Sequence, residues 1–374
     1  MFDIFISSIA TSIACFSLFL LPKGQPTGAL TLVLICLVFF SAGPIVFNLS
    51  PALIQVYVGL VPGVFFLFIP AFFLYHDALI SIKPWCWDNK MLKHFAAVPI
   101  ALLLGIAVII LPEEAFKQMF FSSESLRSWW LSLLSILFFI SVLSWCVLSC
   151  TYLVSILCRT IKHQERIKLV YADKTGRNLN WIVITSILIV FTWAYSLVVL
   201  AFEDQLLDYG VSETGTLILL AIGVWLIAHN GIKQRPGFEE IQDELNPFND
   251  QTNKKPYERS ALSQEDLHRI STKLSVAVGK DKVHFDSALN LPRLSKHLGE
   301  PSQYISQTLS QHLNTTFFDY INSARISEAK QLLMGTNDSI LDIAYDIGFN
   351  SKSSFYKAFR QDMDMTPTQY RKSH

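Results

Sequence analysis

Long apolar segments dominate the first 230 residues and restrict the folds that this part of the chain can adopt. Seven such segments occur, at about 4–21, 29–47, 52–75, 95–111, 129–157, 181–201 and 214–228. Most reach the roughly 20 residues that an α-helix needs to cross about 30 Å of hydrocarbon, and the last is marginal. Hydrophobic residues make up 51% of the 374, and charged residues only 16%, which is unusual for a soluble protein. The sequence therefore predicts a bundle of seven transmembrane helices.

The distribution of Lys and Arg predicts how these helices are oriented. One set of loops carries Lys23, Lys83, Lys90, Lys93, Arg159, Lys162, Arg166, Lys168, Lys174 and Arg177. The opposite set carries only Lys117 and Arg127, and its other charged residues are acidic. Because short cytoplasmic loops are enriched in Lys and Arg, we expect the N-terminus outside and the C-terminus in the cytoplasm. Three roles stay open for the basic segment 159–177: a topology anchor, a binder of anionic lipid headgroups, or a support for DNA near the membrane.

The apolar segments lack the groups that membrane enzymes and carriers use. Their interiors contain no Asp, Glu, Lys or Arg, which proton pumps and ion-coupled carriers normally need at mid-membrane. No cluster of His, Asp and Ser suggests catalysis, and the six cysteines show neither CxxC pairs nor metal-ligand spacing with His. We therefore expect no enzymatic activity, no cofactor and no metal ion.

A polar segment containing Pro236-Gly237 and Asn246-Pro247 follows the last span, and its residues break helices. The sequence thus predicts three parts: a transmembrane sensor-like domain at 1–230, a cytoplasmic linker at 231–262 and a helical domain at 263–374. A coil of about 32 residues has an r.m.s. reach of about 30 Å, so the last domain is expected to stay close to the bilayer.

Residues 339–348 read as a short helix with defined ends. Apolar residues recur at helical spacing within 340–347, and Ser339 with Asp342 fits a capping box in front of them. Gly348 can adopt a positive φ, which ends the helix sharply. A tight turn is therefore predicted at Gly348.

The helix after this turn is expected to have an apolar inner face and a polar, basic outer face. Asn350 or Ser351 can cap it, and Phe355 and Phe359 lie on the buried side. The outer face carries Ser351, Lys352, Ser353, Tyr356, Lys357 and Arg360. Two short helices joined by a glycine turn, the second with such a face, make a helix-turn-helix unit.

The same layout occurs upstream. Leu291, Leu294 and Leu298 form an apolar stripe, 299–301 makes the turn, and a helix is predicted over 302–313. The outer face of that helix carries Ser302, Gln303, Tyr304, Ser306 and Gln307. A long amphipathic helix at 317–333 connects the two units, and a further helix at 265–276, with Ile270, Leu274 and Val276 as its apolar positions, leads into the domain.

The segment 286–372 resembles the DNA-binding domain of the AraC/XylS family of bacterial regulators. The residues that carry the resemblance are Phe317, Tyr320, Ile321, Arg325, Ala329, Leu332, Leu333, Ile343, Ala344, Gly348, Phe349, Phe355, Phe359 and Thr366 to Arg371. Asn314 and Asp364 stand where the family usually has Gly. Asn and Asp tolerate the left-handed region best among the other residues, so both turns are expected to persist.

The resemblance implies a domain with two helix-turn-helix units that contacts double-stranded DNA. Its net charge is nearly zero, so affinity must come from the placement of the basic residues. Lys352, Lys357 and Arg360 are candidates for phosphate contacts, together with Ser351, Ser353 and the N–H groups of the first turn. Base reading would fall to Ser302, Gln303, Ser306 and Gln307 on one helix, and to Lys352, Ser353, Tyr356 and Lys357 on the other.

Together these observations predict an all-α chain in which a seven-helix transmembrane bundle precedes two helix-turn-helix units. The resemblance implies a bacterial transcription regulator that binds DNA. The apolar segments predict that it lies in the inner membrane, with the lipid bilayer as a second partner. Two alternatives remain: an anchored DNA-binding protein released by proteolysis, and a membrane enzyme or carrier with a regulatory DNA-binding tail. A small apolar ligand in the span bundle and a homodimer are further partners that the sequence leaves open.

Overall fold

The computed structural model describes residues 1–21, 27–82, 85–122, 128–173, 176–206, 211–234, 237–238 and 262–373. These residues form helices and no β-strand, apart from one isolated β-bridge between Tyr171 and Asn290. The all-α class predicted from the sequence is confirmed. The chain divides into two compact units: unit 1 comprises Met1–Thr160 and Leu179–Pro236, and unit 2 comprises Ile161–Asn178 and Gly237–His374.

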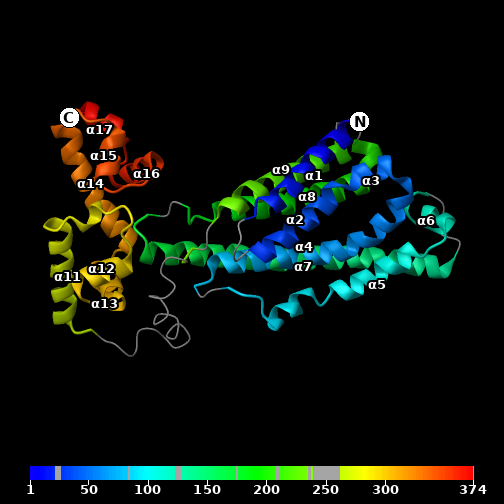
Figure 1. The fold of residues 1–374 in the computed structure, drawn as a ribbon, viewed down its shortest axis with the longest axis horizontal. Coiled ribbons are helices and arrows are strands. Elements are labelled where there is room, and N and C mark those ends of the chain that lie inside the picture. Colours follow the sequence, from blue (N-terminus) through cyan, green and yellow to red (C-terminus); the bar gives the residue numbers. More distant parts are fainter. Residues whose placement is uncertain are drawn as a thin grey trace. The chain divides into compact units, whose positions relative to one another are not determined.

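Unit 1 consists of long apolar helices (Figure 1). Its α-helices are α1 (Phe2–Phe19), α2 (Thr27–Ser41), α3 (Gly43–Leu49), α4 (Ile54–Ile80), α5 (Val98–Ile109), α6 (Glu113–Phe120), α7 (Trp129–Val170), α8 (Asn180–Leu206) and α9 (Glu213–Lys233). Short 3-10 helices, η1 (Pro51–Leu53) and η2 (Asn89–Phe95), precede α4 and α5. Helix α7 begins in unit 1, and its last turns belong to unit 2.

Six helices among the described residues are long and apolar enough to cross a membrane: Phe2–Phe19, Gly28–Leu49, Pro51–Ile80, Trp129–Val170, Asn180–Leu200 and Glu213–Lys233. A seventh candidate is the pair formed by η2 and α5, which meet at an angle of 42°. Pro99 lies in the first turn of α5, where its missing N–H needs no partner, and it disfavours helix in the residue before it. The bend falls at the start of the fourth apolar segment, and α5, with 12 residues, is a candidate span only together with η2.

Helices α4 and α5 approach each other more closely than side chains would allow. A Cβ atom added to Gly105 would lie 2.0 Å from the Gly59 carbonyl oxygen, and one on Gly59 would lie 2.5 Å from Ile109. Small residues permit such contacts between membrane helices. The core of the unit lies between α1, α2, α4 and α9, around Val33, Leu34, Ile69, Phe72 and Val224.

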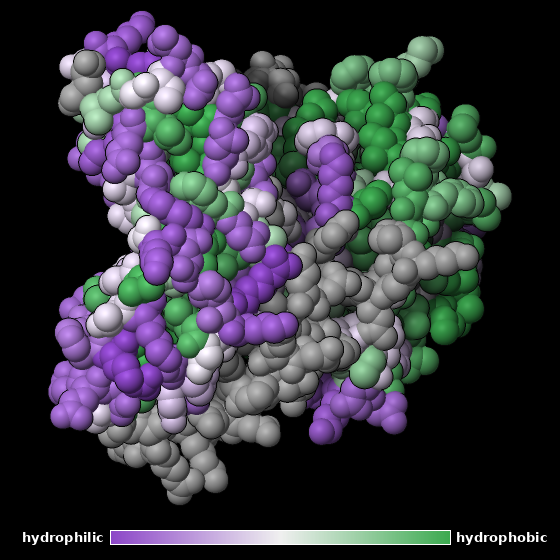
Figure 2. Space-filling model, turned by 60° about the vertical axis from the view of Figure 1, so that its left-hand side comes forward, coloured by the Kyte–Doolittle hydropathy of each residue, from purple (hydrophilic) through white to green (hydrophobic). Residues whose placement is uncertain are grey.

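The surfaces of the two units differ in chemistry. On the face shown in Figure 2, hydrophobic residues cover much of the long helices of unit 1, whereas hydrophilic residues dominate the C-terminal helical domain. On unit 1, Leu103, Ile110 and Leu200 are 68%, 75% and 78% exposed. Exposed apolar patches of this kind mark surfaces that are covered by lipid or by other proteins.

Unit 2 consists of shorter helices, several of which are capped by side chains. They are α11 (Gln264–Gly279), η5 (Val283–Phe285), α12 (Leu291–Leu298), α13 (Ser302–Gln307), the π-helical segment η6 (Thr308–His312), α14 (Phe317–Gly335), α15 (Ile340–Asp346), α16 (Lys352–Met363) and α17 (Pro367–Ser373). The predicted connecting helix is α14. Most of the predicted linker, residues 239–261, lies outside the described residues.

Two details of the predicted helices are wrong. Val276 is 48% exposed, because α11 buries Leu267, Ile270, Leu274 and Ala277, which are spaced three and four residues apart. The helix predicted over 302–313 is an α-helix only to Gln307 and continues as a π-helical segment to His312. A backbone bond from Leu313 N to Thr308 O, at 3.0 Å, closes that wider turn.

Candidate nucleic-acid interface

The turn of the second helix-turn-helix unit depends on a glycine. Ser339 caps α15: Asp342 N donates to its Oγ at 3.1 Å, and its hydroxyl donates to the Asp342 carboxylate at 2.6 Å. Gly348 has a φ of +94°, and a Cβ there would lie 2.7 Å from Phe285 O and 2.8 Å from His284 O. Glycine is thus required both for the backbone conformation and for the close approach. The predicted cap and positive φ are confirmed.

Helix α16 follows this turn with the orientation expected from its sequence. Ser351, not Asn350, is the N-cap: its Oγ accepts from Ser354 N at 3.2 Å. Phe355 and Phe359 are fully buried and pack with Phe349 and Tyr370. Buried aromatic rings therefore fix which side of α16 faces solvent.

The outer face of α16 carries the predicted polar and basic side chains. Lys352, Ser353, Lys357 and Arg360 are exposed, whereas Ser351 and Tyr356 are half-buried. Lys352 Nζ lies 5.4 Å from the centre of the Tyr356 ring, and the Tyr356 hydroxyl lies 3.3 Å from Thr368 Oγ1. These contacts hold Tyr356 at the edge of a face with three cations within nine residues.

The first unit presents a less exposed polar face. Asn290 caps α12 by accepting from Arg293 N at 2.9 Å, and Gly299 ends that helix with a φ of +65°. On α13 the predicted contact residues, Ser302, Gln303, Tyr304, Ser306 and Gln307, are all half-buried. The following turn contains Asn314 with a φ of +50°, and the corresponding turn of the second unit contains Asp364 with a φ of +54°. Both turns expected at these non-glycine positions are confirmed.

Arg325 is a central polar anchor of the domain, and its burial was not predicted. It is fully buried on α14, where Nε donates to His284 O at 2.7 Å and Nη2 donates to Asp286 O at 2.8 Å. Burial lowers the pKa of Arg325 to about 10, so it remains charged at neutral pH. The guanidinium thereby bonds α14 to the segment 284–286, which also lies against Gly348.

Glu300 plays a similar role in the first unit. Its carboxylate is 8% exposed and accepts from Lys273 Nζ at 2.5 Å and from the Arg269 guanidinium. These hydrogen bonds, that of Arg269 first, hold the pKa of Glu300 below its usual range. They join α11 to the turn between α12 and α13.

A loop from outside the helix-turn-helix units is bound to the domain. Asn322 Nδ2 donates to Ala172 O at 3.0 Å, and Asn350 Nδ2 donates to Asp173 Oδ2 at 2.6 Å. Ala172 N also donates to Leu289 O at 3.5 Å. We call residues 171–173 the α7 loop, because they directly follow α7. Sequence reasoning treated this segment only as part of a basic stretch, and no periodic signal could have shown these long-range contacts.

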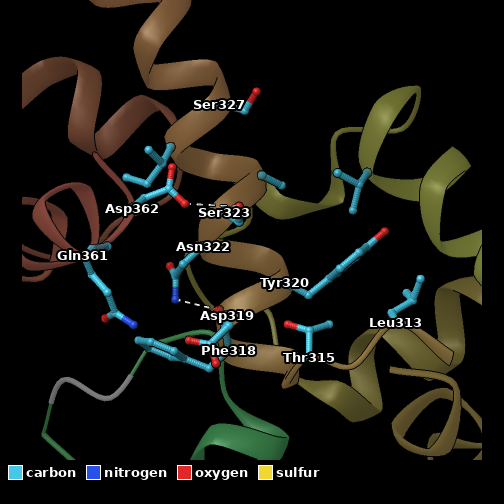
Figure 3. A pocket seen from close by; sticks show the side chains of 14 residues that line it. Leu313, Thr315, Phe318, Asp319, Tyr320, Asn322, Ser323, Ser327, Gln361 and Asp362 are labelled. Atoms are coloured by element: carbon cyan, nitrogen blue, oxygen red, sulfur yellow. Dashed lines mark hydrogen bonds between the residues drawn. The ribbon is translucent and has the colours of Figure 1, made fainter. Parts of the chain in front are cut away.

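A cavity of about 630 Å³ runs along α14, and residues of the first helix-turn-helix unit and of α16 both line it (Figure 3). Asn322 donates to Phe318 O at 2.9 Å within it, and the Ser323 hydroxyl lies 3.4 Å from Asp362. Asp319 and Asp362 line it, and their negative charges would repel phosphate. The cavity is therefore unsuited to extend the predicted DNA-binding face. Among the described residues, no group of three His, Cys, Asp or Glu side chains is placed to hold a metal ion.

Comparison with known proteins gives matches to the C-terminal part of the chain. A family model described as a helix-turn-helix domain matches residues 294–373. An uncharacterised HTH-type transcriptional regulator of Staphylococcus aureus (strain COL) is 36% identical over 90 residues, which are 24% of this chain and 12% of that protein. The melibiose operon regulatory protein of Escherichia coli (strain K12) is 36% identical over 89 residues, which are 24% of this chain and 30% of that protein.

Among solved structures, the C-terminal domain of AraT, a response regulator from Geobacillus stearothermophilus, is similar to part of this chain. The match has 27% identity and a TM-score of 0.26, and it covers 31% of this chain and 89% of that one. The chain spans less than a third of the length of the curated relatives it matches. The family model and the curated relatives agree with the two helix-turn-helix units of the structure: the C-terminal domain of this chain is an AraC-type helix-turn-helix domain.

Proposed function

We propose that this chain is a membrane-embedded transcription regulator, whose span bundle senses a signal and whose C-terminal domain binds a promoter. One observation carries the proposal: an AraC-type helix-turn-helix domain shares a chain with a set of helices long and apolar enough to span a membrane. Such regulators act by binding DNA, so the proposed function is not enzymatic.

The surface of unit 1 supports the membrane part of the proposal. Its exposed side chains include many large hydrophobic ones, such as Phe16, Leu103 and Leu200. Exposing apolar surface to water costs about 25 cal/mol per Å², so dozens of such side chains favour a lipid environment strongly. The basic residues of one set of loops support a topology with the N-terminus outside and the DNA-binding domain in the cytoplasm, where the DNA is.

The two recognition helices have distinct proposed tasks. On α16, Lys352, Lys357 and Arg360 would neutralise phosphates, and Ser353 and Tyr356 would approach base edges. On α13, Ser302, Gln303, Tyr304, Ser306 and Gln307 would enter the next major groove. Helix α14 has 19 residues, or about 28 Å at 1.5 Å per residue, which suits two grooves about 34 Å apart on one face of DNA.

A selection experiment tests the DNA-binding part. The full-length protein, reconstituted in lipid nanodiscs, is mixed with a random DNA pool, and bound DNA is sequenced. We expect enrichment of a site with two half-motifs centred about 10 base pairs apart. Empty nanodiscs are the control. A pool that stays random after several rounds would overturn the proposal.

Topology and sensing need separate experiments. A phosphatase fused at Ser123 should be active, and one fused at Lys174 inactive; the reverse pattern would place the DNA-binding domain on the wrong side. Replacing the first six spans with one unrelated span should leave promoter output constant while DNA binding in vitro persists. A normal response by that variant would mean that the bundle is only an anchor. A shortened C-terminal fragment on a blot would instead support release by proteolysis.

A further inference from the structure

Unit 1 contains a cavity of about 460 Å³. Helices α2, α4, α7, α8 and α9 all contribute to its wall. Its lining is mainly aliphatic and aromatic, with Leu37, Phe65, Phe68, Ile189, Trp193 and Leu220 as examples. The volume falls within the range of small-molecule sites, which is roughly 300–1,000 Å³.

Few polar groups line this cavity, and its hydroxyls already have partners. Thr192 Oγ1 donates to Leu188 O at 2.8 Å, and Ser196 Oγ lies 2.8 Å from Thr192 O and 3.3 Å from Thr216 Oγ1. None of the described residues that line it is charged. A carboxylate, phosphate or ammonium group would therefore lose its hydration here without gaining a countercharge.

Trp145 differs from the other polar residues of the wall. The side chain is 4% exposed, stacks on Phe65 with ring centres 4.2 Å apart and meets the edge of Trp193 at 4.6 Å. Its Nε1–H is buried and has no hydrogen-bond partner among the described residues. Trp145 is one of the residues that line the cavity, and because buried donors are nearly always paired, its N–H is a candidate to bind an acceptor that a ligand supplies.

We propose that this cavity binds an uncharged, lipophilic carbonyl compound, such as a ketone, ester or lactone, whose oxygen accepts from Trp145 Nε1. This inference rests on the proposed function, since it names the class of signal that the bundle would sense. The apolar wall selects for a molecule that reaches the site through the bilayer. The single donor distinguishes a carbonyl compound from a hydrocarbon, which has no acceptor.

The position of Trp145 links the cavity to the α7 loop. Trp145 lies on α7, which is one continuous helix to Val170, and the next residues are those that Asn322 and Asn350 bind. A ligand that prefers one arrangement of α7 against α8 and α9 shifts the population toward that arrangement. The same helix then carries the change to the end that holds the DNA-binding domain.

Two probes of the same shape test the proposal. Benzophenone is an apolar molecule with one carbonyl acceptor, and diphenylmethane lacks that acceptor. Binding of both to the full-length protein in nanodiscs is measured by the shift of thermal unfolding. We expect benzophenone to bind roughly three- to tenfold more tightly, which is the value of one net hydrogen bond. Trp145→Phe should abolish this preference and still bind both probes.

Two further variants make the test specific. Trp129→Phe is the matched control, because Trp129 lies on the same helix but is 78% exposed; it should keep the preference for benzophenone. Gly223 lines the cavity, and a Cβ there would meet only Leu188, at 3.7 Å, so Gly223→Leu should fill the space and prevent binding. On irradiation, benzophenone should label peptides of α7, α8 or α9 in the wild type and not in Gly223→Leu.

The outcomes separate this inference from the proposed function. Equal binding of the two probes to the wild type, with no effect of Trp145→Phe, means that the Trp145 N–H does not bind a ligand carbonyl and overturns the inference. Labelling that persists in Gly223→Leu places the site elsewhere and also overturns it. Failure of the nanodisc protein to select DNA, with probe binding intact, overturns the proposed function but not the carbonyl site.

Discussion

Asn350 Nδ2 lies 2.6 Å from Asp173 Oδ2, so the residue just before the N-cap of α16 is bonded to the loop that follows α7. The same amide donates to Ser287 O at 3.0 Å. A helix N-terminus attracts anions through its free N–H groups. The Asp173 carboxylate therefore lies where a DNA phosphate would approach α16.

Asp173→Asn should strengthen DNA binding. The change removes one negative charge near the approach of a phosphate and keeps a group that can accept from Asn350. We expect the dissociation constant for the selected site to fall roughly two- to tenfold at low salt, with a smaller difference at high salt. Fluorescence anisotropy with the full-length protein measures it. Asp338→Asn, in the exposed segment between α14 and α15, should have no effect; equal effects of both variants would contradict the local argument.

Arg360→Ala should weaken binding to all DNA sequences. An exposed cation that contacts a phosphate contributes through counterion release, so its loss should flatten the dependence of log K on log salt by about one unit. Titrations at four salt concentrations measure this slope. Lys280→Ala removes an exposed cation at the end of α11 as a control. An unchanged affinity of Arg360→Ala at every salt concentration would show that this face does not contact DNA.

Gln303→Ala should relax base preference at one position of the half-site read by α13. A side chain that reads a base edge contributes about 1–3 kcal/mol of discrimination, whereas it adds little to the salt dependence. Repeating the DNA selection with this variant measures the change. A uniform loss of affinity, with the preferred sequence intact, would assign Gln303 to the phosphate backbone.

Gly348→Ala should destabilise the C-terminal domain by about 1–3 kcal/mol, the usual cost of a strained backbone conformation. The new Cβ would also collide with the carbonyls of His284 and Phe285. Hydrogen exchange of the amides in α15 and α16 measures the local effect in the full-length protein. Gly335→Ala is the control, because a Cβ at that position meets nothing within 4 Å. Similar exchange rates in both variants would refute the close-approach argument.

The stability of the C-terminal domain should fall between pH 6.5 and pH 4. Burial lowers the pKa of His284 from 6.5 to about 4, so in this range the unfolded chain binds a proton that the folded domain excludes. The stabilisation is fully present above pH 6.5 and is lost as the pH drops toward 4. His284→Leu should reduce this pH dependence, as seen by hydrogen exchange, and exposed His268→Leu should leave it unchanged. Identical pH profiles for His284→Leu and the wild type would disprove the role of His284.

Local sequence patterns predicted most of the C-terminal domain. The capping pair Ser339 and Asp342, the turn at Gly348 and the buried side of α16 depend on residues a few positions apart, and all agree with the structure. Helical periodicity failed at Val276. This residue is apolar, as the buried stripe of α11 requires, but its position in the chain puts it on the exposed side of the helix. The π-helical segment after Gln307 was missed because its apolar residues also fit an α-helix.

Other features depend on contacts between distant residues, which one sequence does not reveal. Arginine is usually found at the surface, yet Arg325 is buried, and its guanidinium donates to the carbonyl oxygens of His284 and Asp286 in place of water. The pairing of Asp173 with Asn350 crosses 177 positions in the chain. The DNA contacts on α13 and α16 remain predictions, because their chemistry depends on a partner that neither the sequence nor the fold contains.

The crossing of α4 and α5 also has a consequence for recognising related chains. The apolar side chains that face outward from unit 1 can be exchanged for one another, since any of them suits a hydrocarbon environment. Gly59 and Gly105 cannot be exchanged in this way, because a side chain on either residue would collide with the backbone of the other. A change at one of them cannot be compensated by a larger residue at the other. In a set of relatives, these two glycines should stay fixed while the residues around them drift. They are therefore a sharper signature of this bundle than its hydropathy.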